Sequence, residues 1–201
     1  MFIAEDKFIV KRPYKEWTPD SHVEDFGESQ HGIFPGRFQP LTNAHEQRIK
    51  KILQEYPGIV LTIVIGDVGL LNYENFLTPN ERVEILKAVV NNRRWNNVKI
   101  TVVQGGPPRE WVSSLCQTIP KIDLVFSDNP FVIEPLRACG YKTIAFCREG
   151  NCSSDLRNLP FSKWGNEIPG EVFSYISKKN LHYRLKTLPS TGRYPFMMRQ
   201  D

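Results

Sequence analysis

Residues 35–47, PGRFQPLTNAHEQ, combine residue types that suit the binding of anions. A glycine such as Gly36 lets backbone N–H groups approach an anion closely, and Arg37 carries a planar fork of donors. The Thr42 hydroxyl and the His45 imidazole each offer a further donor. Because the stretch follows a short apolar run and opens a helical pattern, it predicts a phosphate cradle at a helix N-terminus, where the helix dipole favours negative charge.

The same residues also have a purely structural interpretation. Gly36 and Pro40 can simply make a turn, Thr42 can cap the following helix, and His45 can be an ordinary surface residue. Since short motifs often match by chance, the residues of this stretch alone leave both interpretations open.

Hydrophobic patterning predicts the elements that position this stretch. Five apolar or β-branched runs predict strands, at residues 31–34, 58–66, 98–105, 122–127 and 142–147. The segments between and after them predict helices, at residues 43–55, 77–92, 108–119, 130–139 and 168–180. Alternating strands and helices indicate an α/β fold, a Rossmann-like doubly wound parallel sheet of about five strands with helices on both faces. Ligands of such folds lie beyond the carboxyl ends of the strands, at the switch point of the sheet.

Length and composition predict one globular domain. The 201 residues are 40% hydrophobic and 24% charged, enough to bury one sizeable core. We expect an N-terminal extension at 1–30, the main domain at 31–180, and a basic and aromatic C-terminal tail at 181–201. The net charge of +4 permits an anionic ligand without demanding nucleic acid.

Neither a membrane protein nor a metal or disulfide scaffold is indicated. The most apolar run is about half the length that a bilayer requires, and the N-terminus lacks the apolar core of a signal peptide, so we expect a cytoplasmic protein without a membrane partner. The four cysteines form no C-x-x-C pair, and we expect reduced thiols, three of them in the core.

Longer strings of the chain resemble a known enzyme family. GRFQPLTNAH (36–45) resembles the signature of the nucleotidylyltransferase superfamily, in which a (His/Thr)-x-Gly-His tetrad follows the first strand, and its GRFQP is most like the archaeal-type nicotinamide-nucleotide adenylyltransferases. Four further strings are similar to that family's later motifs, in the same order: NFLTPNERVEIL (75–86), EWV (110–112), FSDNPFV (126–132) and CSSDLRN (152–158). The motifs span residues 31–177, and several ordered matches are more specific than any single one.

The resemblance implies transfer of AMP from ATP to nicotinamide mononucleotide, with release of pyrophosphate. Because the attacking phosphate oxygen is already anionic, catalysis reduces to positioning and to charge stabilisation. His45, Thr42 and Arg157 are the expected catalytic residues. Arg157 follows Ser153 and Ser154, which we expect to cap a short helix facing the β- and γ-phosphates.

The remaining candidates follow from the same motifs. The expected triphosphate-binding residues are Gly36, Arg37, Phe38, Ser127, Asp128, Asn129, Ser153 and Ser154. The expected acceptor-binding residues are Trp111, whose indole would stack on a pyridine ring, and Arg82, although Trp111 can equally lie in the core and Arg82 can merely support the sheet. We expect Mg²⁺ to bind triphosphate oxygens mainly through water, since no dedicated carboxylate cluster is visible.

Departures from the family pattern leave the substrate open. Ala44 replaces the tetrad glycine, Cys152 to Ser154 replace Ser-Gly-Thr, and GDVGLLNYEN (66–75) lacks the usual small, polar stretch after the second strand. One alternative is a related nucleotidylyltransferase with another phosphorylated acceptor. This alternative includes a cytidylyltransferase, which would use CTP in place of ATP. The other is a regulatory protein that binds a nucleotide without turnover.

The C-terminal tail interleaves basic and aromatic residues. These are Tyr183, Arg184, Lys186, Arg193, Tyr194, Phe196 and Arg199. Such a pattern can bind single-stranded nucleic acid, but it more often packs on its own domain or on a sister subunit. We therefore expect a homo-oligomer rather than a nucleic-acid partner.

Overall fold

The computed structural model describes residues 30–146 and 152–189, which fold around one parallel sheet. Its strands are β1 (His31–Gly36), β2 (Val60–Asp67), β3 (Val98–Gln104), β4 (Leu124–Ser127) and β5 (Thr143–Ala145). They lie in the order β3-β2-β1-β4-β5, and every neighbouring pair is parallel. The predicted Rossmann-like fold class is confirmed, although β2, β4 and β5 begin one or two residues later than expected.

The helices follow the expected pattern closely. They are α1 (Asn43–Glu55), α2 (Pro79–Asn92), α3 (Pro108–Thr118), α4 (Pro130–Ala138), α5 (Ser153–Arg157), α6 (Gly170–Lys178) and α7 (Arg184–Thr187). Two 3-10 turns, Phe161–Asn166 and Leu181–Tyr183, flank α6. The strongest local start is that of α2, where Thr78 and Glu81 cap each other's backbone N–H groups and Pro79 takes the first position.

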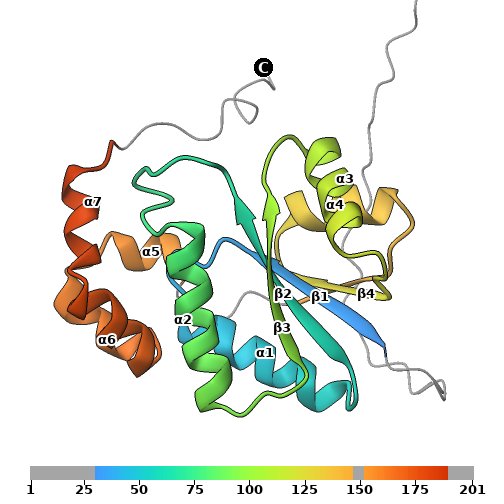
Figure 1. The fold of residues 1–201 in the computed structure, drawn as a ribbon, viewed down its shortest axis with the longest axis horizontal. Helices are drawn as coiled ribbons and strands as arrows, with labels where there is room; N and C mark the ends of the chain where they lie inside the picture. Colours follow the sequence, from blue (N-terminus) through green and yellow to red (C-terminus); the bar gives the residue numbers. More distant parts are fainter. Residues whose placement is uncertain (1–29, 147–151, 190–201) are drawn as a thin grey trace, which may run out of the picture.

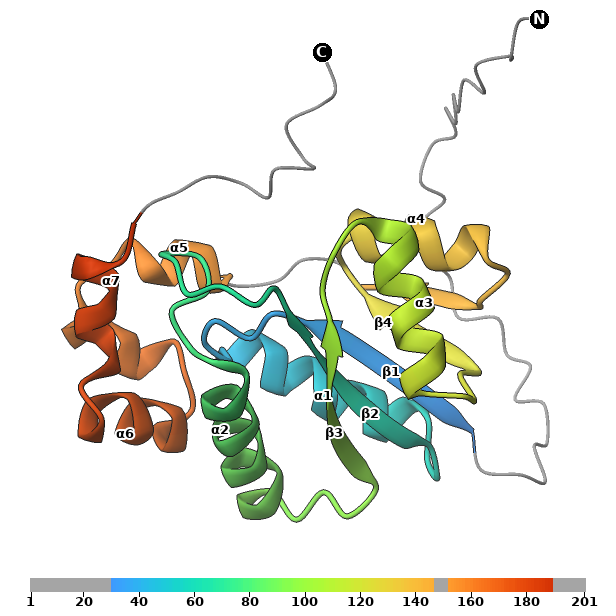
Figure 2. The same ribbon diagram turned by 45° about the horizontal axis from the view of Figure 1, so that its top comes forward.

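Helices cover both faces of the sheet, with α1 and α2 on one face and α3 and α4 on the other (Figures 1 and 2). Because side chains alternate along a strand, β2 contributes to the core on both faces of the sheet. Leu61, Ile63 and Ile65 pack toward α1 and α2, and Val64 packs toward α3 and α4. All four side chains are fully buried. The result is a rigid support whose strand ends hold the loops described below.

The first part of the predicted tail packs on its own domain. Helices α5, α6 and α7 gather beside α2 in both ribbon views (Figures 1 and 2). Leu181 is buried, and the Arg184 guanidinium binds both oxygens of Glu81 over 2.7 and 2.9 Å. Arg193, Tyr194, Phe196 and Arg199 lie outside the described residues, as do residues 1–29 of the predicted extension 1–30.

The cysteine prediction is partly wrong. Cys116, Cys139 and Cys152 are free thiols, as expected. However, Cys139 is exposed because it ends α4 at the surface, and Cys116 and Cys152 are only partly buried. Cys147 lies outside the described residues.

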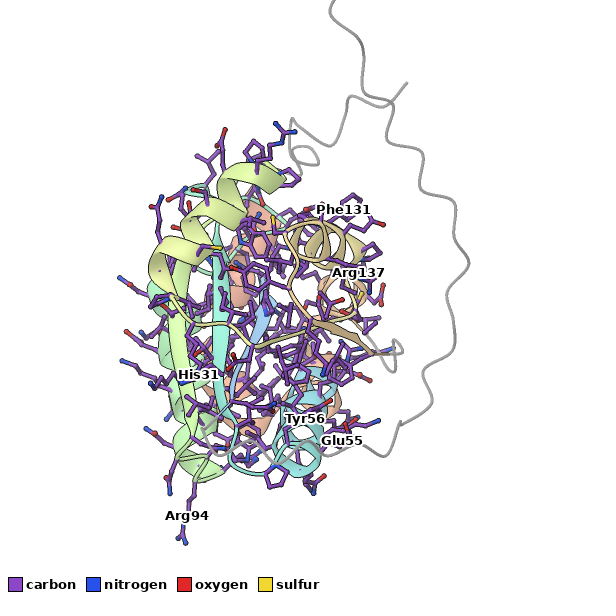
Figure 3. All side chains as sticks on the ribbon, turned by 90° about the vertical axis from the view of Figure 1, so that its right-hand side faces the viewer. His31, Glu55, Tyr56, Arg94, Phe131 and Arg137 are labelled. Atoms are coloured by element: carbon purple, nitrogen blue, oxygen red, sulfur yellow. The ribbon has the colours of Figure 1, made fainter. Side chains whose placement is uncertain are left out.

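The two ends of the fold are well separated. Figure 3 shows Phe131, at the start of α4, at one end of the molecule, and Glu55 and Tyr56, at the end of α1, near the other. Helices α1 and α4 both begin at the edge formed by the carboxyl ends of the strands. The candidate site, near the starts of α1 and α4, therefore lies at the opposite edge of the sheet from the end of α1.

Candidate active site

The candidate site lies where the strand order reverses, between β1 and β4. Residues 37–42 leave β1 at this point, and Asp128 and Asn129 leave β4. Diverging connections on either side of such a switch point open a crevice for a ligand. The structure thus brings the stretch 35–47 to the position that the sequence predicted.

The loop after β1 is held in one conformation by buried contacts. Gln39 is buried and exchanges two side-chain hydrogen bonds with the backbone of Leu77, over 2.8 and 2.9 Å. Phe38 adopts a φ of 49°, which is unfavourable for a bulky residue. Its ring is buried against Phe34 and His45, with centroid distances of 5.9 and 5.2 Å. These contacts offset the backbone strain and fix the loop relative to α1.

Gly36 and Phe38, both expected to bind triphosphate, have packing roles here. A Cβ on Gly36 would lie 2.7 Å from the Phe38 ring, so a glycine is needed for the ring to fold back over β1. The Phe38 side chain is itself buried. Their contacts therefore explain both residues without a ligand, and only their backbone groups remain for the predicted triphosphate contact.

His45 is locked by Thr42, the N-cap of α1. The main-chain N–H of Thr42 donates to Nδ1 of His45 over 3.0 Å, and the Thr42 hydroxyl lies 2.8 Å from the same atom. In return, the His45 N–H donates to the Thr42 hydroxyl over 3.4 Å. This is a capping box with histidine in place of the usual glutamate. The fully buried Thr42 hydroxyl is thus directed at His45.

The environment of His45 keeps its ring neutral. Burial is the main cause that lowers the pKa of His45, from 6.5 to about 4. The positive charge of Arg48 lowers this pKa further, and the negative charge of Asp128 raises it. Because Nδ1 accepts from a backbone N–H, the neutral ring carries its proton on Nε2. His45 therefore offers one N–H donor of fixed direction.

Arg157 is a buried cation with few partners. Its residue is 6% exposed, and its Nη1 donates to the carbonyl of Gln39 over 2.7 Å. Its Nε has no hydrogen-bond partner, and no carboxylate lies within ion-pair distance among residues 30–146 and 152–189. Burial, and then the positive charge of Arg37, lower the pKa of Arg157. A cation buried in this way favours an anionic ligand.

Arg82 supports the sheet rather than reaching into open space. It is 2% exposed, and its Nη1 donates to the carbonyls of Arg37 and Gly66 over 3.0 and 2.8 Å. Its Nη2 also lies 3.6 Å from a carboxylate oxygen of Asp67. These bonds tie the carboxyl ends of β1 and β2 together. One side of Arg82 also borders an open hollow beside Asp67, Leu70 and Leu71.

The short helix α5 starts differently from the prediction. Its N-cap is Cys152, whose N–H and thiol both contact Asp155, so the expectation that Ser153 and Ser154 are the caps is wrong. Ser153 instead donates to the carbonyl of Pro40 over 2.9 Å. Ser154 is exposed and contacts Cys152. Ser153 thereby anchors α5, and with it Arg157, to the loop after β1.

The turn after β4 uses its polar groups within the fold. The buried Ser127 hydroxyl accepts from the N–H of Asn129 over 3.1 Å, and Asn129 caps α4. Asp128 forms an ion pair of 2.9 Å with Arg48, one helical turn beyond His45. The pair joins α1 to the turn after β4, on the two sides of the switch point.

Among the described residues, Trp111 makes no hydrogen bond, ion pair or ring contact with the other candidates. It lies on α3, partly buried against the core cluster on that face of the sheet. Its packing role is visible, and its acceptor role stays a prediction.

Sequence reasoning missed three residues at this edge: Gln39, Arg48 and Tyr73. The Tyr73 hydroxyl lies 2.9 Å from the carbonyl of Arg157, and the Arg157 guanidinium lies 5.8 Å from the Tyr73 ring. Only Arg48 had a local signal, because a residue at i+3 shares a helix face with His45. Gln39 and Tyr73 contact residues that are distant in sequence.

Within 30–146 and 152–189, no three His, Cys, Asp or Glu side chains gather in a way that could hold a metal ion. None of the helices described has the length and apolar character needed to cross a membrane.

Comparison with known proteins supports the arrangement. A family model described as cytidylyltransferase-like matches residues 33–157. A nicotinamide-nucleotide adenylyltransferase of Sulfurisphaera tokodaii is 29% identical over 168 residues, covering 78% of this chain and 95% of that protein. Its counterpart in Pyrobaculum arsenaticum is 27% identical, covering 82% of this chain and 97% of its own.

Solved structures share the fold. A bifunctional NMN adenylyltransferase/ADP ribose pyrophosphatase of Francisella tularensis, complexed with AMP and a manganese ion, has a TM-score of 0.64 at 14% identity over 80% of this chain. The matched region is about half of that longer protein, 52% of its length. A nicotinic acid mononucleotide adenylyltransferase of Plasmodium falciparum, complexed with NaAD, has a TM-score of 0.54 at 16% identity, covering 77% of this chain and 98% of its own.

Proposed function

The chain belongs to the cytidylyltransferase-like family, and we propose that it transfers the adenylyl group of ATP to nicotinamide mononucleotide, forming NAD and releasing pyrophosphate. An oxygen of the acceptor phosphate attacks the α-phosphorus of ATP. A new P–O bond forms, the bond from that phosphorus to the bridging oxygen breaks, and pyrophosphate leaves with the electron pair. No residue of the protein is consumed, so the enzyme has to hold the reactants in line and stabilise charge.

The observation that carries this proposal is that one loop, residues 37–42, holds both His45 and Arg157. Arg157 donates to the carbonyl of Gln39, and His45 is locked by Thr42, three residues further along the same loop. His45 offers an N–H donor that stays neutral, and Arg157 offers a buried positive charge without a carboxylate partner among the described residues. A hydrogen-bond donor and a cation held by the same loop are the groups that a transferring phosphoryl group requires.

Each side chain then has a distinct role. His45 would donate from Nε2 to an oxygen of the α- or β-phosphate as negative charge shifts toward the leaving group. Arg157 and Arg37 would bind the β- and γ-phosphates. Thr42 would act as a positioning residue, since its hydroxyl is directed at His45. Gly36, Phe38, Ser153 and Ser154 would contribute through the backbone and through loop anchoring.

The nucleoside and acceptor ends are proposed from the motifs. Ser127, Asp128 and Asn129 would border the nucleoside, because they leave β4 on the other side of the switch point. Trp111 and Arg82 would border the acceptor, Arg82 by shaping the hollow beyond β2. The apolar Leu70 and Leu71 beside that hollow, exposed by 74% and 43%, favour one second candidate, an acceptor other than a pyridine mononucleotide.

The proposed divalent ion is Mg²⁺, carried by the triphosphate itself. The described residues supply no carboxylate cluster for it, which fits an ion held by phosphate oxygens and water. When bound, it would neutralise charge on the phosphates that leave as pyrophosphate. A cytoplasmic location and assembly into a homo-oligomer are further proposals.

Pyrophosphate release by the purified full chain tests the function. ATP or CTP would be paired, with Mg²⁺ present, with nicotinamide mononucleotide, nicotinate mononucleotide and a panel of other phosphorylated acceptors. We expect release with ATP and nicotinamide mononucleotide, and NAD as the product. Release only with another pair would replace the substrate, and no release despite nucleotide binding would favour a regulatory protein.

A further inference from the structure

A tight turn in the connection from β2 to α2 places two consecutive side chains against Arg157 and Arg37, the two cations assigned above to the β- and γ-phosphates. Asn72 and Asn75 pair as an isolated antiparallel bridge, with hydrogen bonds of 3.3 and 3.0 Å between their backbones. The Asn72 side chain also accepts from the N–H and the amide of Asn75, over 2.8 and 3.0 Å. Tyr73 and Glu74 are the two central residues of this closed turn.

Tyr73 fixes the turn against the C-terminal part of the fold. Its hydroxyl lies 2.9 Å from the carbonyl of Arg157 and 3.0 Å from Oδ1 of Asn158, and its own N–H donates to the carbonyl of Pro189 over 3.1 Å. The Arg157 guanidinium lies near the Tyr73 ring. The position of Glu74, the next residue, follows from these anchors.

Glu74 forms an ion pair with Arg37, one of the residues proposed to bind the triphosphate. Its carboxylate accepts from Nη1 of Arg37 over 3.0 Å, and both side chains are partly exposed, by 38% and 42%. The charge of Glu74 also acts on Arg157, where it opposes the effect of Arg37. One carboxylate therefore lies near both cations to which the β- and γ-phosphates are assigned above.

We propose that Glu74 is a resident counter-ion of the triphosphate site, which binds Arg37 in the nucleotide-free protein and is displaced when a triphosphate binds. This inference rests on the proposed function, because it takes Arg37 and Arg157 as triphosphate ligands. A carboxylate and a phosphate repel each other, and an exposed ion pair is weak enough to exchange. Glu74 thereby lowers the affinity for polyanions while keeping Arg37 oriented, and it makes the connection from β2 to α2 respond to the nucleotide.

The test is the affinity of the full chain for ATP and for pyrophosphate, measured by calorimetry. Glu74→Gln keeps the shape of the side chain and removes its charge, so we expect ATP and pyrophosphate to bind about three- to tenfold more tightly. AMP, which lacks the β- and γ-phosphates, should change by less than about twofold. Glu74→Ala should show the same gain, and circular dichroism would confirm that each variant is folded.

A matched control separates this effect from net charge. Glu55→Gln removes the same charge from an ion pair with Lys51 at the far end of α1, about 20 Å from the helix start, and should leave both affinities unchanged. A double-mutant cycle with Arg37→Met tests whether Glu74 acts on triphosphate binding through Arg37. Once Arg37 is absent, Glu74→Gln should gain less than about twofold.

Three outcomes overturn the inference: equal or weaker binding by Glu74→Gln, the same gain in Glu55→Gln, or a full gain that persists without Arg37. If the wild-type protein releases pyrophosphate while one of these holds, the proposed function stands and only the role of Glu74 falls. If the wild-type protein binds neither ATP nor pyrophosphate, both proposals fall.

Discussion

The main-chain N–H of Thr42 donates to Nδ1 of His45 over 3.0 Å, which fixes the imidazole at the first turn of α1 with its proton on Nε2. A histidine held in this way needs no protonation to act as a donor. Its low pKa, caused mainly by burial, is then an advantage, because one neutral form is present across the physiological pH range. The capping box and the proposed catalytic donor are the same pair of residues.

Replacing His45 should remove most of the turnover. For His45→Ala we expect the rate of pyrophosphate release to fall at least about a hundredfold, the scale for losing one preorganised donor to a developing charge. The affinity for ATP should change much less, because Arg37 and Arg157 remain. Steady-state kinetics, with circular dichroism as the check on folding, measures both. An unchanged rate in a folded variant would exclude His45 from the mechanism.

Thr42 should affect catalysis only through His45. Thr42→Val keeps the size of the side chain but removes the hydroxyl that lies on Nδ1, so we expect kcat to fall about tenfold while KM for ATP stays within about twofold. The lost cap should also cost about 1 kcal/mol of stability. Thr42→Ser, which restores a hydroxyl, should recover both. A KM effect larger than the kcat effect would instead indicate that Thr42 binds the triphosphate directly.

The pKa of His45 also predicts how stability depends on pH. Between pH 6.5 and about 4 the unfolded chain takes up a proton on this ring and the folded protein does not, so the free energy of unfolding falls as the pH falls. The loss attributable to His45 should reach roughly 2–3 kcal/mol near pH 4. Urea unfolding at pH 7 and pH 4.5 would compare wild type with His45→Ala, since other groups contribute equally to both. The variant should lose less stability on acidification, and an identical loss would contradict the lowered pKa of His45.

Arg157 should favour ATP binding at a cost to the stability of the fold. Because its guanidinium is buried with one hydrogen bond and an unpaired Nε, Arg157→Met should weaken ATP binding more than about tenfold and raise the stability by about 1 kcal/mol.

The same substitution at Arg82 is the matched control for that prediction. Arg82 is also buried but donates to three carbonyls and lies beside Asp67, so Arg82→Met should lower the melting temperature. Calorimetric melting and nucleotide titration measure the two effects. If Arg157→Met melted below wild type, Arg157 would be a structural residue like Arg82.

Local sequence patterns predicted the strands and helices and their order along the chain. Thr78 and Glu81 predicted the start of α2 because a capping box involves only groups three residues apart, and the continuous apolar run in β2 predicted a strand buried on both faces. The stretch 35–47 predicted the place of the site because a glycine-bearing turn between a strand and a helix leads to the edge where ligands bind. These inferences depend on near neighbours along the chain.

The role of each polar side chain depends on contacts between distant parts of the chain, which local patterns do not predict. Arg37 and Arg157 look alike in sequence, yet one is half exposed and paired with Glu74, whereas the other is buried against the carbonyl of Gln39, 118 residues away. Burial and charge pairing depend on which loops the strand order brings to one edge of the sheet, and that order follows from packing across the whole core. The phosphate cradle at residues 35–47 could therefore be predicted from neighbouring residues. Which of the site's arginines are paired with a carboxylate could not.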